Sequence, residues 1–464
     1  MAEGSAAYDI VVLGGGSGGY ACALRAAEMG KRVALIEKDK VGGTCLHRGC
    51  IPTKALLHSA EIADQARESE TFGVKSSYDG IDIDGVLSYK NKVVDRLWKG
   101  LQSTLASRKI DMIDGYGKLI SPTQVQVGGT IYEGEHIVLA TGSVPKSLPG
   151  LELDGERVIS SDEALRYGRV PSSVIILGGG VIGVEFASVW RSFGADVTIV
   201  EMLPQLLPLE DESSAKLLQR AFRRRGIGFE LGARFESVKP TDSGVTVTLA
   251  GGKTLDAQLL LVAVGRGPVS ADLGYEEAGV EMERGYVKVD EYCRTSVPTI
   301  SAVGDLIATP QLAHVGFAEG ILVAERIGGL EVHPIDYDGV PRITYSDPEV
   351  ASVGISAAQA ADRGIETVEF TYPLGGNGRS VILQTQGAGK VIAAKNEDGS
   401  PGRVLGIHLV GSRVGELIAE GQLIYNWEAE PADVAQLIHP HPTQSEIMGE
   451  AMLALAGKPL HVHA

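Results

Sequence analysis

The sequence predicts an α/β protein in which two Rossmann-like three-layer domains are followed by an α+β domain. Three observations support this prediction. The chain has 464 residues, which is more than a single hydrophobic core normally supports. A strand, a glycine-rich loop, a helix and a strand that ends on Glu occur near the N-terminus, and the same order recurs in the middle of the chain. From Pro341 onward, short strands mix with helices and no glycine fingerprint is present.

The first fingerprint is a G-x-G-x-x-G loop that follows an apolar strand at 8–13. A helix at 20–29 and a strand at 32–36 come next, and Glu37 ends that strand. Such a loop lets a pyrophosphate approach the free N–H groups of the helix, and the acid is placed to bind ribose hydroxyls. Glycine-rich turns also occur for packing reasons, but strand, helix and acid are all in place here. The dinucleotide-binding candidates are Gly14, Gly16, Gly19 and Glu37.

The next stretch holds two of the four cysteines, Cys45 and Cys50, in a C-x4-C spacing. Cysteines of intracellular proteins are mostly inert and buried, and a zinc site would need a second pair of ligands nearby. Residues five apart on a regular helix point about 140° apart, whereas a disulfide needs Cα atoms within about 7 Å. We therefore expect the helix to be interrupted between the two cysteines, where Gly49 supplies backbone freedom. Our interpretation is a disulfide that is broken and remade in each turnover.

We call the segment that contains Cys45 and Cys50 the redox stretch. Between it and the second fingerprint, the pattern predicts a helix at 83–107 and a strand that ends in a turn of small residues. That turn consists of Thr141, Gly142 and Ser143. The segment 144–150 contains two prolines and is expected to be a linker. The predicted strands are 111–117, 124–127 and 136–140.

The second fingerprint follows a strand at 173–177 and has the same glycine spacing, with a helix that ends at Phe193. The strand at 197–200 ends on Glu201, 23 residues after the first glycine, as Glu37 is in the first fingerprint. Two dinucleotide sites in one chain suggest a flavin enzyme that uses a nicotinamide. A carboxylate at Glu201 would repel the 2′-phosphate of NADP and favours NAD. The candidates are Gly178, Gly180, Gly183 and Glu201.

The basic run Arg223-Arg224-Arg225 lies on the next predicted helix, and we interpret it as a solvated helix face rather than a phosphate site. A turn is predicted at 265–268, beginning with Gly265. Asp305 follows a strand, where a carboxylate commonly binds a ribose or ribityl hydroxyl, although capping of the next turn explains it equally well. Short strands are expected at 235–238, 245–249, 259–264, 286–289 and 299–303.

The C-terminal part predicts an α+β domain that ends on the segment H-P-H-P-T-Q-S-E. A histidine with a carboxylate five residues later, as in His441 and Glu446, can be a base held in one tautomer. Thr443 and Glu446 also fit a capping box, but thiol–disulfide exchange needs a base near neutral pH, which favours catalysis. The expected strands are 342–345, 350–353, 367–372, 389–395 and 404–410, and the expected helices are 414–426, 432–437 and a last one that ends at 455.

Composition limits the kinds of partner. Hydrophobic residues make up 44% and charged residues 22% of the chain, the balance of a globular protein. A net charge of −17 argues against nucleic acid or an anionic membrane surface. No apolar run approaches a membrane span, and residues 1–8 lack the pattern of a signal peptide. We therefore expect a cytoplasmic protein without nucleic-acid, membrane or metal partners.

Taken together, these motifs resemble the pyridine nucleotide–disulfide oxidoreductase family over nearly the whole chain. The resemblance covers both fingerprints, G-G-T-C-x4-C-I-P-T-K, A-T-G-S, G-R-x-P, Gly304-Asp305 and H-P-T-x-S-E. Within the family, the chain is most similar to the branch that oxidises dihydrolipoyl groups, because of the C-I-P-[ST]-K continuation, Glu201 and the segment Gln311-Leu312-Ala313-His314. The redox loop of the family usually has Asn where this chain has His47.

The resemblance implies roles for the candidate residues. The first fingerprint would hold FAD and the second NAD. Lys54 would lie near the flavin and pair with Glu185, which would face the nicotinamide. His441, oriented by Glu446, would be the base for the partner subunit's Cys45 in a homodimer. Further cofactor contacts implied by the resemblance are Gly117, Thr141, Gly142, Ser143, Gly265, Asp305, Leu312, Ala313 and His314.

The resemblance also implies an FAD-binding domain at 1–147, an NAD-binding domain at 148–275, a central domain at 276–342 that completes the FAD site, and a dimerisation domain at 343–464. The implied reaction is oxidation of dihydrolipoamide to lipoamide with reduction of NAD, through the cysteine pair and FAD. Implied partners are lipoyl domains of 2-oxo acid dehydrogenase E2 subunits or the glycine cleavage H protein. One alternative is an NAD(P)H-dependent reductase of a small disulfide such as glutathione or mycothione. A structural flavoprotein subunit or NADH sensor is another.

Overall fold

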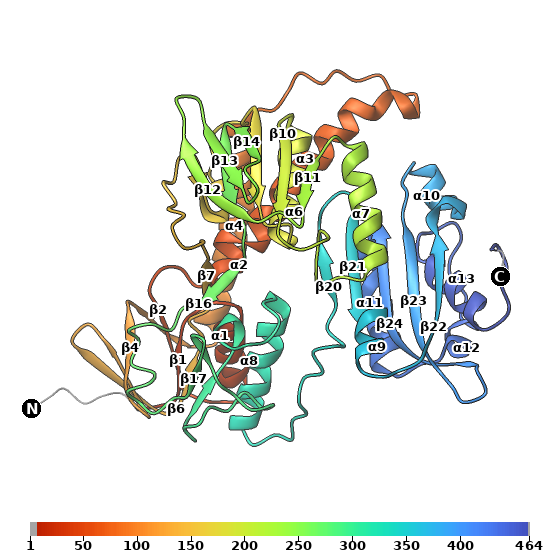
Figure 1. Cartoon of the computed structure of the whole chain (residues 1–464). Helices are drawn as coiled ribbons and strands as arrows, with labels where there is room; N and C mark the ends of the chain where they lie inside the picture. Colours follow the sequence, from red (N-terminus) through yellow and green to blue (C-terminus); the bar gives the residue numbers. More distant parts are fainter. Residues whose placement is uncertain (1–6, 463–464) are drawn as a thin grey trace, which may run out of the picture.

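The computed structural model describes residues 7–462, which form three large sheets of seven, five and five strands (Figure 1). The parts of the chain built on these sheets lie side by side, with the third sheet and its helices at the right of the view. The predicted absence of a signal peptide concerns residues 1–8, of which 1–6 lie outside the described residues. Within 7–462, no helix combines the length and the apolar character needed to cross a bilayer.

The first sheet has the strand order β3-β2-β1-β6-β5-β4, and β19 pairs with β6. Its strand β1 (Ala7–Leu13) is fully buried at Ile10, Val11 and Val12, which explains an uninterrupted apolar sequence where an exposed sheet face would alternate. The segment after the second sheet returns to the first, because β19 runs parallel to β6. The other strands are β2 (Val33–Glu37), β3 (Asp111–Asp114), β4 (Gly117–Ser121), β5 (Gln124–Val127), β6 (Thr130–Leu139) and β19 (Ile300–Ala302).

Helices α1 (Ser17–Glu28) and α8 (Ala313–Ile327) pack against each other beside this sheet. Small residues allow the close approach: a Cβ on Gly320 would lie 2.2 Å from the carbonyl oxygen of Gly18. Gly18 therefore serves helix packing, so one glycine of the first loop has the packing role that we weighed against nucleotide binding.

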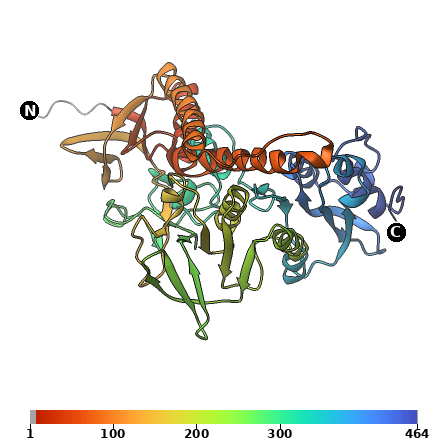
Figure 2. The same cartoon turned by 90° about the horizontal axis from the view of Figure 1, so that it is seen from above.

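Three further helices follow β2. They are the short α2 (Gly43–Arg48), the long α3 (Cys50–Glu68), which continues into the 3-10 turn η1 (Ser69–Phe72), and α4 (Ile83–Ser107). Figure 2 shows α3, in orange-red, running from the first sheet's domain to the C-terminal domain. Helix α3 thus connects Cys50, at its first residue, with the C-terminal domain.

The second sheet is parallel, with the order β11-β10-β9-β15-β8, and a small antiparallel sheet β12-β13-β14 lies next to it in sequence. Its helices are α5 (Ser161–Ala164), α6 (Val181–Phe193) and α7 (Glu212–Arg224). The strands are β8 (Val158–Ile159), β9 (Ser173–Leu177), β10 (Asp196–Glu201), β11 (Gly228–Leu231), β12 (Phe235–Pro240), β13 (Val245–Leu249), β14 (Thr254–Ala257) and β15 (Leu259–Val262).

The C-terminal domain is an antiparallel sheet, β20-β21-β24-β23-β22, with helices around it. The predicted α+β arrangement is therefore confirmed. The strands are β20 (Arg342–Thr344), β21 (Glu349–Gly354), β22 (Thr367–Pro373), β23 (Ala388–Lys395) and β24 (Pro401–Gly411). The helices are α9 (Ala357–Asp362), α10 (Gly378–Ile382), α11 (Val414–Asn426), α12 (Pro431–Val434) and α13 (Glu446–Leu455), and η3 is Leu374–Gly376.

Several sequence predictions were wrong in detail. The predicted turn at 265–268 and the start of the predicted linker pair as antiparallel strands, β16 (Arg266–Pro268) with β7 (Ser143–Pro145). The single strand expected at 111–117 is two strands, since Gly115 has a φ of +143° and breaks the run. Likewise, Arg225 is not on a solvated face, because it forms ion pairs with Asp64 and Asp347. A small hairpin not anticipated is β17 (Met282–Glu283) with β18 (Tyr286–Val287).

Glu349 lies where α3 meets the C-terminal domain. Its carboxylate accepts a hydrogen bond from the N–H of Gly415 near the start of α11, at 2.9 Å. Burial raises the pKa of this carboxyl to about 7, and the neighbouring carboxylates of Glu416 and Glu61 act in the same direction. Because the folded state binds this proton more tightly than the unfolded chain does, the group costs stability as pH rises from about 4.3 through 7.

We therefore expect Glu349→Gln to raise the melting temperature at pH 8 and to leave it nearly unchanged at pH 4.5. The amide keeps the acceptor for Gly415 but has no proton to lose. Thermal unfolding of both proteins across this pH range measures the effect. An equal shift at every pH would contradict the assigned ionisation.

Candidate active site

The redox stretch has the interrupted helix that the sequence predicts. α2 ends at Arg48, Gly49 has φ −147° and ψ −111°, and α3 begins at Cys50. The stretch also rests on the first nucleotide loop, since a Cβ on Gly43 would lie 2.6 Å from the Cα of Gly16. Gly43 has a φ of +58°, so both its backbone conformation and its surroundings require glycine. The cysteine pair is thereby held directly against the first fingerprint.

Cys45 and Cys50 are both partly buried and are not joined by a disulfide in the structure. The hydrogen bond from Cys45 and the nearby Lys54 ammonium lower the pKa of the Cys50 thiol to about 7, against the effect of burial. The same hydrogen bond and burial raise the pKa of Cys45. These directions favour the thiolate at Cys50 and the thiol at Cys45 when the pair is reduced. The predicted reversible disulfide between them stays a prediction.

The other two cysteines are buried and unreactive, as most cysteines of intracellular proteins are. Cys22 and Cys293 are buried, and burial raises the pKa of both thiols. Among residues 7–462, no group of three or more His, Cys, Asp or Glu side chains is arranged to hold a metal ion.

Lys54 and Glu185 form the predicted ion pair. Lys54 Nζ donates to both carboxylate oxygens of Glu185 at 2.8 Å, and the N–H of Tyr345 donates to Oε1 at 2.9 Å. Glu185 is only 2% exposed. Burial acts to lower the pKa of Lys54, but the Glu185 carboxylate and the Cys50 thiolate outweigh it, so the net shift is upward. A permanent cation therefore lies beside the Cys50 sulfur, between α3 and α6.

Both glycine loops have space for a dinucleotide. The Cβ of a residue at Gly14 or Gly178 would lie 2.3 Å from the carbonyl oxygen of Ala140 or Ala263, which directly follow the neighbouring strands β6 and β15. Gly16 and Gly180 are the N-caps of α1 and α6, without a side-chain cap, and a Cβ there would meet no atom within 4 Å. Free N–H groups, a helix dipole and open space are what a pyrophosphate needs. The last glycines, Gly19 and Gly183, approach the carbonyl oxygens of Gly14 and Gly178.

The two acidic residues hold the loops from behind. Glu37 Oε2 accepts the N–H of Gly15 at 2.7 Å, and Glu201 Oε2 accepts the N–H of Gly179 at 2.6 Å. Each carboxylate keeps lone pairs for a ribose hydroxyl. Since Glu201 is fixed in this way, a phosphate at the ribose 2′ position would meet a carboxylate that cannot move away, which favours NAD over NADP in the second site.

The remaining predicted contacts lie around the first loop. Ser143 donates to Asp305, and Arg266 Nε donates to Ser143 Oγ at 2.8 Å. Asp305 lies in η2 (Gly304–Leu306), whose N-cap is Val303, so capping does not explain the aspartate. Thr141 Oγ1 donates to the Val269 carbonyl at 2.6 Å. Gly142 and Gly265 have positive φ, Gly117 is buried in β4, Leu312 and Ala313 begin α8, and the His314 ring lies 2.8 Å from the Pro341 carbonyl.

Sequence reasoning missed Glu319, which is completely buried on α8. It accepts the N–H of Gly304 at 2.6 Å and the hydroxyls of Thr309 and Tyr337 at 2.8 and 3.0 Å. Burial raises the pKa of this carboxyl even though all three hydrogen bonds oppose the shift. Glu319 therefore holds the turn that carries Asp305, and its one signal in the sequence is an acid among the small and apolar residues in the middle of α8.

The predicted pair of His441 and Glu446 is present on the C-terminal domain. His441 Nδ1 lies 2.8 Å from Glu446 Oε1, and the N–H of Thr443 donates to Glu446 Oε2 at 2.9 Å. One carboxylate thus orients the histidine and accepts the N–H of Thr443. The capping box was wrong, because the N-cap of α13 is Ser445 and no side chain caps it. A second pair, His439 with Glu420 at 2.7 Å, was not predicted. The His441 side chain is 75% exposed and that of His439 only 11%.

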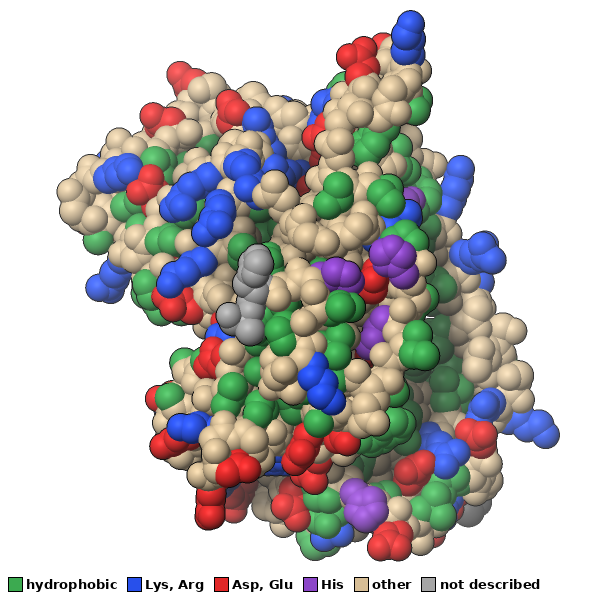
Figure 3. Space-filling view, turned by 90° about the vertical axis from the view of Figure 1, so that its right-hand side faces the viewer, with side chains coloured by type: hydrophobic (Ala, Val, Ile, Leu, Met, Phe, Trp, Pro, Cys, Tyr) green, Lys and Arg blue, Asp and Glu red, His purple; other side chains and the backbone are tan. Residues whose placement is uncertain are grey.

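A single chain does not bring His441 to its cysteines. Figure 1 places α13 on the outer side of the C-terminal domain and α2 near the centre of the molecule. Figure 3 shows that histidine and hydrophobic side chains gather on the face of the molecule at the C-terminal domain side. Exposed apolar residues of this domain include Leu437 and Ile438, of which Ile438 is 97% exposed. The pair of His441 and Glu446 therefore lies on a surface with exposed apolar side chains, which a single chain leaves open to solvent.

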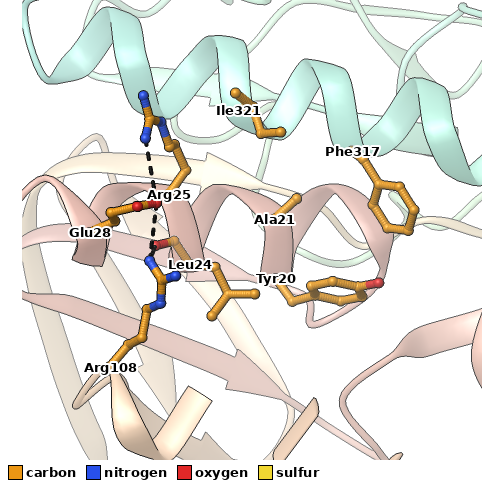
Figure 4. A pocket seen from close by; sticks show the side chains of 8 residues that line it. All are labelled: Tyr20, Ala21, Leu24, Arg25, Glu28, Arg108, Phe317 and Ile321. Atoms are coloured by element: carbon orange, nitrogen blue, oxygen red, sulfur yellow. Dashed lines mark hydrogen bonds and ion pairs between the residues drawn. The ribbon is translucent and has the colours of Figure 1, made fainter. Parts of the chain in front are cut away.

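A groove of about 370 Å³ lies between α1 and α8 (Figure 4). Tyr20 lies at one end of the residues that line it, tilted against Phe317 with ring centroids 5.5 Å apart. Burial, and then the nearness of Cys45 and Cys50, raise the pKa of Tyr20 to about 12. Of the residues that line the groove, Tyr20 is thus the one on which the charges of the cysteine pair act. Its other lining residues are Ala21, Leu24, Ile321, Arg25, Glu28 and Arg108.

Comparison with known proteins gives consistent matches. The model of the family described as pyridine nucleotide-disulphide oxidoreductase matches residues 8–320, and the dimerisation domain of the same family matches residues 340–452. Dihydrolipoyl dehydrogenase of Bacillus subtilis is 40% identical, covering 98% of this chain and 99% of its own. The mitochondrial dihydrolipoyl dehydrogenase of Pisum sativum is 37% identical over 100% of this chain and 94% of its own.

The fold is also similar to solved structures. The crystal structure of LpdA from Mycobacterium tuberculosis has a TM-score of 0.89 to this chain and 28% sequence identity. The match covers 96% of this chain and 99% of that one. The similarity therefore extends over all three large sheets.

The Lys54 ammonium lowers the pKa of Cys50. We therefore expect Lys54→Met, which removes this charge, to raise the pKa of Cys50. In the wild type, the rate of alkylation of Cys50 in the reduced protein should have its midpoint near pH 7. In the variant the midpoint should rise by about one unit or more. Mass spectrometry of the Cys50 peptide after iodoacetamide treatment at graded pH measures it. Lys54→Arg keeps the charge and is the matched control, and an unchanged midpoint in Lys54→Met would contradict the assignment.

Proposed function

We propose a function from the premise that these matches establish, which is that the chain belongs to the pyridine nucleotide-disulphide oxidoreductase family. It is an NAD-dependent flavoprotein disulfide oxidoreductase whose cofactors are FAD and NAD. Within this family, we propose that its substrate is the dihydrolipoyl group, which it oxidises to the cyclic disulfide while NAD⁺ becomes NADH. The observation that carries the proposal is the Cys45–Cys50 pair across the Gly49 break, with Lys54 and Glu185 beside Cys50.

The residues that would hold the cofactors are those of the two fingerprints. Gly14, Gly16, Gly19 and Glu37 would bind the pyrophosphate and ribose of FAD, with Asp305 on its ribityl chain. The NAD site would be formed by Gly178, Gly180, Gly183 and Glu201. When bound, FAD supplies a two-electron acceptor for the cysteine pair, and NAD⁺ supplies the final acceptor.

The chain's own residues would carry the exchange of sulfur bonds. His441 of the partner subunit takes a proton from one substrate thiol, and the resulting thiolate attacks the Cys45 sulfur of the oxidised pair. The Cys45–Cys50 bond breaks and Cys50 leaves as a thiolate, which its pKa of about 7 and the Lys54 cation favour. The second substrate thiol, once deprotonated, attacks the substrate sulfur bound to Cys45. The bond between Cys45 and the substrate sulfur breaks and the cyclic disulfide departs. The proton of the second substrate thiol passes to Cys45 while the first stays on His441, so the substrate loses two electrons and the cysteine pair gains them.

The α1–α8 groove suits an aliphatic substrate. Leu24, Phe317 and Ile321 supply apolar surface along it, and its volume of about 370 Å³ is in the range of small-molecule sites. A lipoyl chain is a flexible hydrocarbon arm that ends in the dithiol, whereas glutathione carries several charges. The groove's single charged end, at Arg25, Glu28 and Arg108, is internally paired. The lining therefore supports the lipoyl substrate over a charged peptide disulfide.

The match to the dimerisation domain and the apolar surface around His441 support a homodimer that serves 2-oxo acid dehydrogenase complexes. As the finer proposal, the lipoyl groups would be carried by E2 subunits of such complexes or by the glycine cleavage H protein. The direct test is steady-state turnover of the purified protein with NAD⁺ and dihydrolipoamide. Equal or faster turnover of glutathione disulfide or mycothiol disulfide with NADPH would refute the proposal in favour of a small-disulfide reductase.

Loss of either cysteine should abolish this reaction. We expect Cys45→Ser and Cys50→Ser to retain FAD and to lose at least about 99% of dihydrolipoamide oxidation, since the exchange requires both sulfurs. Flavin content by absorbance and NADH formation at 340 nm give the two readouts. Cys293→Ser removes a buried thiol outside the site and serves as the control. Substantial turnover by either active-site variant would mean that the pair is not the redox centre.

A mixture of variants tests whether the base comes from the other subunit. In a heterodimer of one Cys45→Ser chain and one His441→Gln chain, one site receives both intact residues only if His441 acts across the dimer. After denaturation and refolding of an equal mixture, we expect about a quarter of the wild-type activity, because half of the dimers are mixed and each has one complete site. Each variant refolded alone is the control. No recovery in the mixture, despite mixed dimers by mass spectrometry, would place the base within the same chain.

A further inference from the structure

Arg225 lies at a junction of four segments that are distant in sequence. Its side chain follows the last turn of α7 and is 19% exposed. Nη2 donates to Asp64 Oδ2 on α3 at 3.1 Å and to Ser192 Oγ on α6 at 2.8 Å. Nη1 donates to the Asp347 carbonyl at 2.8 Å and to Ser188 Oγ on α6 at 3.3 Å. One guanidinium group therefore joins α3, α6, α7 and the segment before β21.

Asp64 is held from its other side as well. Arg67 donates to Asp64 Oδ1 and also to the Ser192 carbonyl, and the Ser192 hydroxyl donates to Asp64 Oδ2 at 2.5 Å. Both carboxylate oxygens are thus occupied by donors from α3, α6 and α7. A planar guanidinium that bridges several acceptors at fixed angles cannot be replaced by a lysine without losing contacts.

The Arg225 network is a second attachment between the two helices that already meet at Lys54 and Glu185. On α3, Lys54 and Asp64 are ten residues apart, or about 15 Å along the axis. On α6, Glu185 and Ser192 are seven residues apart, or about 10 Å. Two rods joined at one point can rotate about it, whereas a second joint at a distance fixes their crossing angle. Tyr345 and Asp347 connect the joints, since their N–H groups donate to Glu185 and to Ser188.

We propose that Arg225 is a positioning residue that fixes the angle between α3, which carries Cys50 and Lys54, and α6, which carries Glu185. This inference rests on the proposed function in one respect, because it assigns the consequence to the nicotinamide side of the reaction. Loss of the distal joint lets α6 turn about the Lys54–Glu185 pair. The second nucleotide site, at the N-terminus of α6, then moves relative to the redox pair, while the α1–α8 groove does not.

The test compares Arg225→Gln and Arg225→Lys with Arg224→Gln. Arg224 is the adjacent residue, and its side chain is exposed and makes no hydrogen bond or ion pair with any side chain or backbone group of residues 7–462. Arg224→Gln therefore removes the same charge as Arg225→Gln without breaking the Arg225 network. In Arg225→Gln we expect kcat/KM for NAD⁺ to fall about tenfold, within the range that distal coupling residues produce. The KM for dihydrolipoamide should stay within about twofold, and Arg225→Lys should recover part of the loss.

Hydrogen exchange provides a readout that needs neither substrate. In Arg225→Gln, amides of the C-terminal half of α6 and the distal half of α3 should exchange faster, while those of α2 and of α1 should not change. Asp64→Asn should give the same pattern, and the double variant should add little to either single one, as expected for residues of one network. The melting temperature is measured in parallel for all variants.

Two outcomes would overturn the inference. Arg225→Gln could behave like Arg224→Gln in both kinetics and exchange, or it could affect both substrates and all peptides equally, as general destabilisation would. Failure of the proposed function looks different, because the wild type would then not oxidise dihydrolipoamide with NAD⁺ while the exchange pattern of the variants remained. Selective loss on the nicotinamide side, with exchange raised only at the distal joint, supports the inference.

Discussion

The ion pair between Lys54 and Glu185 is the interaction on which the rest of the site depends. Taking two charges out of water is costly, and only close geometry and further hydrogen bonds offset the loss of solvation. Here the carboxylate is 2% exposed, receives both contacts from the ammonium, and accepts the N–H of Tyr345. The pair has two effects at once. It joins the helix after the cysteines to the helix of the second nucleotide loop, and it supplies the positive charge that favours a thiolate at Cys50.

Features that depend on local backbone geometry could be predicted from the sequence. The two fingerprints require glycine at fixed places because any Cβ at Gly14 or Gly178 would collide with the next strand. The helix break at Gly49 follows from the angle between residues five apart, and the structure has it. The pairing of Lys54 with Glu185 came from resemblance to a family, and that of His441 with Glu446 came from their spacing; the distances agree with both. In these cases the information lies within a few residues or in a known motif.

Other features could not be predicted because each depends on residues far apart in the chain. The β7–β16 pairing joins 143–145 to 266–268, and the segment between them contains all five strands of the second sheet. In the sequence, Arg225 cannot be distinguished from the other arginines of a basic helix face. Only the structure shows that α3 and α6 supply the acceptors of its hydrogen bonds. Glu319 is an acid in the apolar middle of α8, and the three groups that donate hydrogen bonds to it come from other segments. A polar residue has no local signature of the partner that will satisfy it.

The two His–Glu pairs on the C-terminal domain differ in what they can do. His439 is mostly buried, packs against Gly449, and its hydrogen bond with Glu420 raises its pKa, so it stabilises the turn before α13. His441 has the same kind of partner but is largely exposed. An exposed imidazole is a poor general base in water, since catalysis benefits from a site that excludes solvent. Ile438 precedes His441 by three residues, and its almost completely exposed side chain is costly to leave in water. Covering this surface with a second subunit, as the dimerisation domain implies, would exclude water from His441 and bury Ile438, which is why the proposed site needs two chains.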